Sequence, residues 1–525
     1  YAILHDSPTP VSLLRSDIPS HLENIIEKAL AKKLKERYPD IGELIRDLKK
    51  SQSVALPKAE KSIVVLPFEN LSPDPDQEYF CDGMTEEITS DLSKIHDLLV
   101  ISRNSAMTFK GTKKKTKEIG KELNVHYVLE GSVRKAGNNL RITAQLIDAK
   151  TDTHIWTDKY SGVLDDIFDI QESVSRSIAE QLKIKLSPQD ISNIKEGSLE
   201  NVKAYDCYLR ARFELTKYTS ASFDRARDFL QKSLNIIGEN ALLYAMLGQA
   251  FYWYHDFGFA IDLDPLQEAE KYAKKASELN PDLAPIHFLL GLLERGKGNL
   301  KKAVRYINQA VQIDSNDPYM LSMFIWTNSA YVGRSKDMRS YAVKLMEIDP
   351  VSPINYFTIS MMYLAEGQWN KGTELMRKCI ELDPGFRWVN LWLAHIYARI
   401  QDNSKFYEVV DHLLEEDSED IIAQWILFLR NIYEKNWRNA LKALNKDLED
   451  FCWKDPEGVW LMAGCFATIG ERDHALKWME HAFERGWINY PLFARIDPFL
   501  ENIRGEPRFK KLMERVKHEW ENFEV

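Results

Sequence analysis

The sequence lacks the features that mark secreted, membrane-spanning and nucleic-acid-binding proteins. Its 525 residues include only five cysteines, with no C-x-x-C and no paired spacing: Cys81, Cys207, Cys379, Cys452 and Cys465. Such scatter favours a reducing, cytoplasmic compartment over a disulfide framework. No run approaches the ~18 apolar residues that a membrane helix requires, and no signal-peptide pattern opens the chain. The formal net charge of −10 argues against nucleic acid as the main partner, because phosphate binding needs a basic face.

Motifs for catalysis and metal binding are also missing. The histidines are dispersed, with no H-E-x-x-H and no Cys/His ligand spacing, and no G-x-S-x-G is present. Gly291 to Gly298 has the spacing of a phosphate-binding loop but ends in Gly298, where Ser or Thr must hold magnesium. Asp256-Phe257-Gly258 spells a kinase metal-binding triplet, but no His-Arg-Asp stands upstream of it. We therefore expect no catalytic residues, no cofactor and no metal in this chain.

The sequence does contain one short motif, with an aliphatic residue at its second position, that recurs at a fixed interval. Its aliphatic residues Leu279, Ile313, Ile348 and Leu382 are 34, 35 and 34 residues apart. A period of 34 with proline closing most units is typical of stacked helical hairpins. Each hairpin can bury its apolar side only against its neighbours, so the repeat predicts an all-α superhelical solenoid.

The repeats resemble tetratricopeptide (TPR) repeats. In the unit 284–317, the small residues Gly291, Ala303 and Ala310 fall where the TPR pattern needs close helix contact. In the unit 353–386, Tyr363 and Pro384 fit the same pattern. We predict about eight units over residues 201–489, with 318–352 the poorest match, followed by capping helices over 490–525.

Residues 62–186 have a different periodicity. The run Ser62 to Phe68 is largely β-branched, which is typical of a buried strand. We expect helices over 77–96, 115–123 and 163–186, and further strands over 98–102, 127–134, 140–147 and 154–160. This alternation predicts an α/β domain with a mixed sheet of about five strands. The fold class is therefore multidomain: a linker over 51–61, a mixed α/β domain, a joint over 187–200 and the solenoid.

Two further resemblances bear on the setting of the chain. The phrases Val65-Leu66-Pro67-Phe68 and Tyr79-Phe80-Cys81-Asp82-Gly83-Met84 are similar to a TolB-amino-terminal-like (FlgO-like) domain. Residues 1–50, from Ala2-Ile3-Leu4-His5 to Glu36-Arg37-Tyr38, resemble the end of the C-lobe of bacterial Ser/Thr protein kinases. That resemblance implies a piece of a longer protein, whose catalytic motifs, with ATP and magnesium, would lie before Tyr1.

The resemblance to TPR arrays implies a concave groove that binds proteins or peptides. Its inner face would include these residues: Arg295, Phe357, Met361, Trp388, Trp392, His395 and Arg399. Arginine and large aromatic residues are enriched at binding hot spots; the alternative is that they only fill space between repeats. We expect the protein-binding regulatory region of a bacterial Ser/Thr kinase-type signalling protein, or else part of an active kinase with its catalytic motifs upstream.

One basic segment stands apart from this scheme. Lys113, Lys114, Lys115 and Lys117 form a run without interleaved aromatic residues. Such a run is typical of a solvated loop and helix start. The alternative is a contact with an acidic partner or with nucleic acid.

Overall fold

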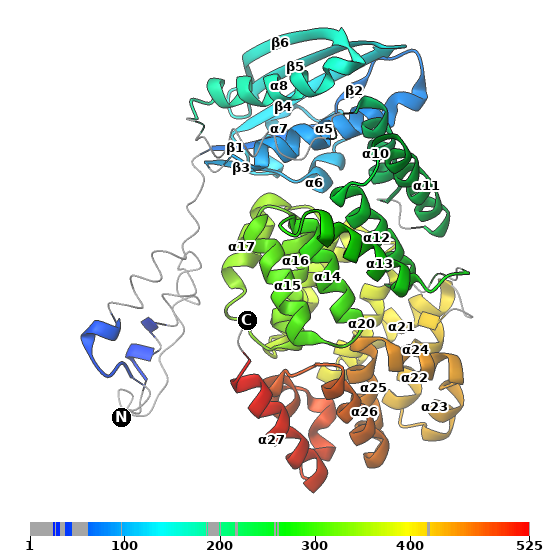
Figure 1. Cartoon of the computed structure of the whole chain (residues 1–525). Coiled ribbons are helices and arrows are strands. Elements are labelled where there is room, and N and C mark those ends of the chain that lie inside the picture. Colours follow the sequence, from blue (N-terminus) through cyan, green and yellow to red (C-terminus); the bar gives the residue numbers. More distant parts are fainter. Residues whose placement is uncertain are drawn as a thin grey trace.

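A computed structural model describes residues 25–26, 28–31, 37–44, 61–95, 97–184, 186, 199, 201–215, 219–256, 259, 262–416 and 421–523. Within them, an α/β domain precedes a long array of helical hairpins (Figure 1). This order confirms the predicted fold class. Most of the kinase-like segment 1–50, of the linker 51–61 and of the joint 187–200 lies outside the described residues.

The sheet is mixed, as predicted, with the strand order β3-β1-β4-β5-β6. Strand β1 (Lys61–Val65) lies between β3 (Leu98–Val100) and β4 (Tyr127–Ala136) and is parallel to both. Strands β5 (Asn139–Asp148) and β6 (Thr153–Val163) continue the sheet as antiparallel neighbours. The two-residue strand β2 (Glu69–Asn70) also pairs with β4. Because β1 is the central parallel strand, it is buried on both faces, which explains its continuous apolar run.

Helices cover the two faces of the sheet unequally. On one face, α5 (Glu78–Ser93) and α8 (Ile167–Gln181) pack over all the long strands, against residues such as Ile63, Leu129 and Ala144. On the other face, the short helices α6 (Arg103–Met107) and α7 (Thr116–Glu122) pack against Val64 and Val128. In the described part of the chain, the stretch of this second face over β5 and β6 has no helix above it.

The hairpin array comprises these helices: α10 (Val202–Leu215), α11 (Ser220–Ile237), α12 (Ala241–Asp256), α13 (Pro265–Leu279), α14 (Ala284–Gly296), α15 (Leu300–Ile313), α16 (Pro318–Trp326), α17 (Arg339–Ile348), α18 (Pro353–Ala365), α19 (Trp369–Leu382), α20 (Arg387–Ile400), α21 (Asn403–Glu416), α22 (Ile421–Tyr433), α23 (Trp437–Ala443), α24 (Lys446–Lys454), α25 (Pro456–Ile469) and α26 (Arg472–Glu484). Several begin with proline, whose fixed φ and missing N–H suit the first helical position. The aspartates before Pro265, Pro318 and Pro456 accept hydrogen bonds from the first free backbone N–H groups.

Small residues bring the helices of a hairpin together, as the repeat pattern predicts. A Cβ atom on Gly291 of α14 would lie 2.6 Å from the side chain of Ile307 and 3.2 Å from the carbonyl oxygen of Ala303, both in α15. Such an approach is too close for any larger residue. Gly291 therefore has a packing role, and the resemblance to a phosphate-binding loop has no structural counterpart here.

The array departs from regular repeats in the unit 318–352. Helix α16 ends in a π-helical turn, η4 (Thr327–Tyr331), and α17 begins only at Arg339. The carbonyl oxygens of Ser329 and Ala330 accept hydrogen bonds from the Asn489 side chain, and that of Tyr331 accepts one from the Ile488 N–H. The poorest match to the repeat is therefore the point to which the C-terminal part of the chain returns.

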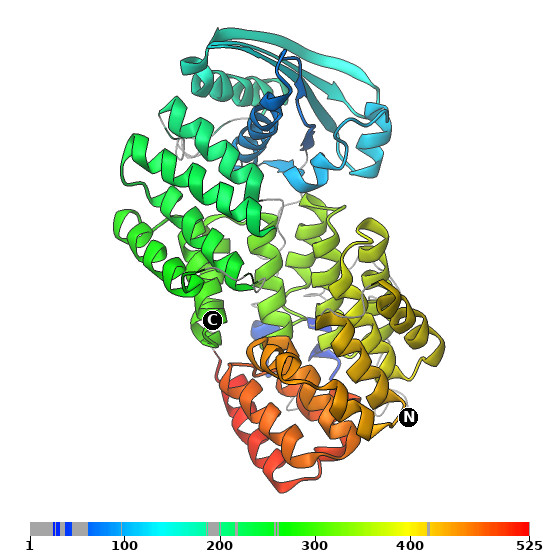
Figure 2. The same cartoon turned by 90° about the vertical axis from the view of Figure 1, so that its right-hand side faces the viewer.

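The C-terminal part turns back along the array after α26. It passes through the short turns η5 (Leu492–Ile496) and η6 (Pro498–Ile503) into helix α27 (Pro507–Glu521). In both views, the α/β domain lies at one end and α27 at the other, with α14 to α16 between them (Figures 1 and 2).

Candidate functional site

The seven residues predicted to line a peptide groove lie on the inner helices α14, α18 and α20, but they do not line an open surface. Five of them expose 7% of their surface or less: Phe357, Met361, Trp392, His395 and Arg399. Arg295 and Trp388 are half-buried. In this conformation most of these side chains are buried inside the array. The peptide groove at these side chains stays a prediction.

Arg399 shows what occupies the concave side. Its Nε lies 3.1 Å from Oδ1 of Asp497, just before η6, and the two side chains expose 1% and 0% of their surface. The indole N–H of Trp460 donates to the other oxygen of Asp497 at 2.8 Å. The guanidinium also lies over the ring of Phe499, 4.4 Å from its centroid. A buried charge needs such a partner, so this ion pair holds the C-terminal segment inside the superhelix.

The neutral state of His395 follows from the same packing. Its ring is fully buried on α20, one turn before Arg399. Burial, and secondarily the positive charge of Arg399, hold the pKa of His395 well below its usual value. A histidine in this environment stays uncharged at neutral pH and contributes packing.

A second buried polar cluster ties the first half of the array to the last. Arg295 of α14 lies 3.4 Å from Asp256 of α12 and 3.6 Å from Glu457 of α25. Glu457 also accepts hydrogen bonds from the Tyr331 hydroxyl and, at 3.2 Å, from the indole N–H of Trp326. Asp256, the first residue of the kinase-like triplet, therefore has a structural partner, while Phe257 and Gly258 lie outside the described residues.

Contacts nearer the surface also join the C-terminal segment to the first half of the array. Lys301, at the start of α15, forms an ion pair with Glu519 of α27, and Arg334 donates to the carbonyl oxygen of Phe523. Gly333 has φ of +75°, and a Cβ atom there would lie 2.5 Å from the Asn489 side chain. The chain can pass so close only because that position is glycine. We call the contacts of residues 455–523 with residues 252–334 and 399 the C-terminal closure.

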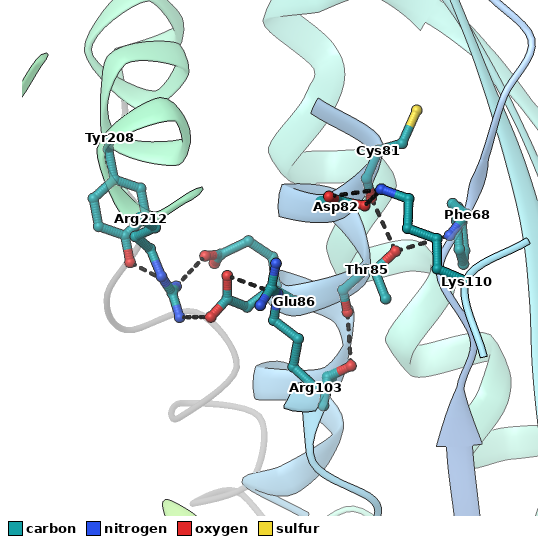
Figure 3. A network of polar contacts seen from close by, with 11 residues as sticks. Phe68, Cys81, Asp82, Thr85, Glu86, Arg103, Lys110, Tyr208 and Arg212 are labelled. Carbon is teal, nitrogen blue, oxygen red and sulfur yellow. Dashed lines mark hydrogen bonds and ion pairs between the residues drawn. The ribbon is translucent and has the colours of Figure 1, made fainter. Parts of the chain in front are cut away.

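The α/β domain is joined to the array at a first contact between α5 and α10 (Figure 3). Arg212 of α10 points to α5, where it forms ion pairs with Glu86 and, at 2.9 Å, with Glu87. It also donates to the hydroxyl of Tyr208 at 2.8 Å. Burial raises the pKa of Glu87 to about 7, although the charge of Arg212 opposes the shift. The Arg212 guanidinium is therefore the main counter-charge at this contact.

The motif around Cys81 to Met84 shapes this contact. Asp82 is buried and accepts two hydrogen bonds from the Lys110 ammonium at 2.6 and 2.8 Å (Figure 3). A Cβ atom on Gly83 would lie 2.7 Å from the side chain of Leu209, so glycine lets α10 approach α5. Thr85 accepts a hydrogen bond from the N–H of Phe68 at 3.0 Å. These residues position the first array helix on the sheet domain.

A second contact joins the α/β domain to the end of α17. The backbone N–H of Ser102 donates to the carbonyl oxygen of Ile348 at 2.6 Å, and the hydroxyls of Ser102 and Ser105 donate to the buried carboxylate of Asp349. The equivalent aliphatic residues of three other repeats expose 37–51% of their surface, whereas Ile348 exposes 2%. The repeated motif is similar in each case, and the one at 347–350 differs from that at 381–384 only by Ile348 in place of Leu, so the sequence gives no signal for this contact.

Three general properties of the described residues bear on function. No helix among them is both long and apolar enough to cross a membrane. No three His, Cys, Asp or Glu side chains gather there in a way that could hold a metal ion. All five cysteines are unpaired, and burial raises the pKa of the Cys81 thiol to about 12, so this thiol is unreactive.

Two protein-family models match the chain. A model described as the second domain of HilA/YgeH-like transcriptional regulators matches residues 59–176, which form the α/β domain. A tetratricopeptide-repeat model matches residues 284–317, the unit of α14 and α15. The array therefore contains a TPR repeat. The TolB-like and kinase-like resemblances are not among these matches and stay predictions.

Curated relatives match parts of the chain. A Rhizobium meliloti protein named "Putative adenylate cyclase 3" is 42% identical over 189 residues, which cover 36% of this chain and 32% of the relative. The anaphase-promoting complex subunit CDC16 of Saccharomyces cerevisiae is 23% identical over 209 residues, covering 38% of this chain and 24% of that protein. The matched segments thus span about a third or less of these relatives.

Solved structures match parts of the chain at low similarity. The human IFIT1 dimer with m7Gppp-AAAA covers 60% of this chain and 77% of its own, at a TM-score of 0.39 and 18% identity. YrrB, a TPR protein with an unusual peptide-binding site, covers 35% of this chain and 90% of its own, at a TM-score of 0.24 and 20% identity. Similarity this low supports no inference about the function of this chain.

Proposed function

We propose that this chain is the partner-binding, regulatory part of a larger bacterial signalling protein, and that its TPR array holds a protein partner. TPR repeats support the protein-binding role. The relative named as an adenylate cyclase, matched over a third of its length, supports a signalling setting in which an output domain lies elsewhere in the polypeptide. In this arrangement the α/β domain lies between the output domain and the array along the polypeptide.

The observation that carries this proposal is the double attachment of the α/β domain. Arg212 fixes α10 to α5, and Asp349 fixes the end of α17 to Ser102 and Ser105. Two attachments, separated by about 140 residues of the array, prevent the domain from rotating about either one. A partner held by the array is thereby held in a defined place relative to the α/β domain and to what precedes it.

The chemistry of the output domain has two candidates. The adenylate cyclase relative favours a nucleotide cyclase, which would make a cyclic nucleotide from a nucleoside triphosphate. The kinase-like motifs in residues 2–38 favour a Ser/Thr protein kinase. The codons upstream of Tyr1 discriminate between them, because a kinase needs a Gly-rich loop, an ATP-anchoring lysine and a catalytic aspartate there.

We place the partner site on the inner helices α14, α18 and α20, where it becomes accessible when the C-terminal closure opens. The closing contacts combine hydrogen bonds and ion pairs at Glu457 and Asp497 with apolar packing, such as that of Tyr331 against Trp487, and opening exchanges both kinds for contacts with water or with the partner. The aromatic and arginine residues of these helices would then be exposed together, as the hot-spot composition predicts.

The test uses the complete gene product with a lysine cross-linker in its own bacterium. We expect a partner cross-linked to lysines of the array; cross-links confined to other regions, or none, would reject the proposal. With the purified partner, Glu457→Gln should bind several-fold tighter than the wild type, because it weakens the closure. Glu434→Gln, which removes a surface charge next to Arg430, is the matched control. Equal affinity for both variants would reject the inner-helix site but leave partner binding by the array intact.

A further inference from the structure

The second face of the sheet, uncovered over β5 and β6 and bordered by α7 on β4, is polar and basic. On this face the strand register forms three rows of directly opposed residues: Arg134, Arg141 and Ser161; Ser132, Thr143 and Lys159; Glu130, Gln145 and Thr157. The alternate residues of the same strands, such as Leu140 and Ile142, point into the core beneath α5 and α8. From Glu130 to Arg134 in β4 and from Arg141 to Gln145 in β5, side chains therefore alternate between the core and this second face.

The basic side chains on this open face form no ion pairs with other described residues. Arg134 lies directly opposite Arg141 on the neighbouring strand, an arrangement of like charges that destabilises a sheet. In the described part of the chain, neither arginine nor Lys159 has a carboxylate within ion-pair distance. Two acids share this face: Glu130, which accepts a hydrogen bond from the hydroxyl of Thr116 at 3.1 Å, and the exposed Glu69 of β2, which lies opposite Ser132. The face thus keeps a local positive charge in a chain of net charge −10.

The same face ends in an open strand edge. Strand β6 pairs with β5 on one side and, among the described residues, with no strand on the other. It is 11 residues long and lies on the side of the domain away from the array (Figure 1). Ile155 and Val163 expose 39% and 38% of their surface and each lies four residues from Lys159; Val163 continues the regular alternation, whereas Ile155 lies at a register shift of β6 against β5. Sheet edges of this length are usually shortened, bulged or covered; β6 is irregular at Ile155 but keeps a regular register with β5 from Trp156 to Val163.

We propose that this edge takes up an extended, acidic segment of a partner protein as an additional strand beside β6. Its backbone would pair with the free N–H and C=O groups of β6, and its acidic side chains would lie toward Lys159, Arg141 and Arg134. Apolar side chains four residues to either side of the central acid would cover Ile155 and Val163. A polypeptide fits better than nucleic acid, because only a polypeptide strand satisfies both the backbone edge and the two apolar positions.

This surface is separate from the site proposed on the array. An acidic partner bound there would weaken an unfavourable interaction of the free domain. The Arg134–Arg141 opposition lowers the stability of the free sheet, so an acidic partner gains affinity by removing that repulsion. Because α10 and α17 hold the domain on the opposite side, a strand can be added at β6 without moving the array.

The test is fluorescence polarisation of the full chain with a fluorescein-labelled peptide, Val-Thr-Glu-Thr-Glu-Thr-Glu-Thr-Val. We expect saturable binding that falls at least tenfold in the triple variant Arg134→Ser, Arg141→Ser, Lys159→Ser. The control variant Lys442→Ser, Lys510→Ser, Lys511→Ser removes three exposed charges from α23 and α27 and should bind like the wild type. Unchanged binding to the first triple variant would overturn the proposal.

Further probes separate strand addition from simple charge attraction. The same peptide with N-methylated backbone amides should fail to bind; equal binding would overturn the added strand. A single-stranded oligonucleotide or phosphatidylglycerol vesicles that displace the peptide at lower concentration would assign the face to another ligand and overturn it. So would a dimer in sedimentation velocity that the triple variant abolishes. The triple variant should unfold at the same or a higher temperature than the wild type, since it removes like charges.

Discussion

Arg399 illustrates how a residue type that favours binding becomes part of the interior. Its position on an inner helix of a TPR unit, beside Trp392 and His395, fits the composition of a binding surface. Its partner Asp497 lies 98 residues further along the chain, in a segment without repeat character. Helical periodicity identifies which face of α20 points inward, but it carries no information on a distant carboxylate that fills the same space.

The Arg399–Asp497 pair gives a prediction at this scale. Arg399→Met should lower the free energy of unfolding by about 3–5 kcal/mol, because it leaves the Asp497 carboxylate buried without a counter-charge. The double variant Arg399→Met, Asp497→Asn should recover part of this loss. Arg430→Met, which removes exposed ion pairs with Asp411 and Glu434, should lower it by less than about 1 kcal/mol. Urea unfolding measures all three, and equal losses for Arg399→Met and Arg430→Met would refute the assignment.

At the scale of elements, the periodicity of apolar residues predicted the strands and helices that are long enough to show a repeating pattern. The strands β1, β4, β5 and β6 were predicted within a few residues, because β-branched runs and alternation mark buried and half-buried strands. The five-residue helix α6 and the two-residue strand β2 were missed, since neither is long enough to show a pattern. The turn η4 was seen only as a poor repeat, because its geometry depends on contacts with Asn489 and Ile488.

The contact between α5 and α10 gives a prediction that depends on pH. Arg212→Met should destabilise the attachment of the α/β domain more at pH 8 than at pH 5. Because burial raises the folded-state pKa of Glu87 to about 7, this carboxyl binds a proton at pH 5 and needs no counter-charge. As the pH rises from the usual value of about 4.3 through 7, stability is lost, and the loss is steeper without Arg212.

Urea unfolding at the two pH values, with Arg430→Met as the control, measures this difference. Glu86 and Glu87 are partly exposed, so a loss of about 1–3 kcal/mol at pH 8 is expected for Arg212→Met. The Arg430→Met effect should not change with pH in this direction. An Arg212→Met effect that is larger at pH 5 than at pH 8 would contradict the role given to Glu87.

At the scale of the whole molecule, the repeat period predicted a solenoid but not its closure. Stacking of like units follows from 34-residue spacing and small residues such as Gly291, both visible in the sequence. The closure depends on a few single polar residues far apart in the chain, among them Arg295, Glu457 and Asp497. The burial of the candidate groove residues on α14, α18 and α20 could therefore not be predicted from the repeat, and the groove itself stays a prediction.

One measurement tests the closed superhelix most directly: zero-length cross-linking of the full chain with a carbodiimide, which joins a lysine to a carboxylate only when the two are in contact. Lys297 and Glu270, 2.9 Å apart in neighbouring hairpins, should be joined in any TPR solenoid and provide the internal control. Lys301 and Glu519 are 218 residues apart in the sequence and meet only if α27 returns to α15. The closed structure predicts both cross-links. A Lys297–Glu270 cross-link without a Lys301–Glu519 cross-link would show an open rod and contradict it.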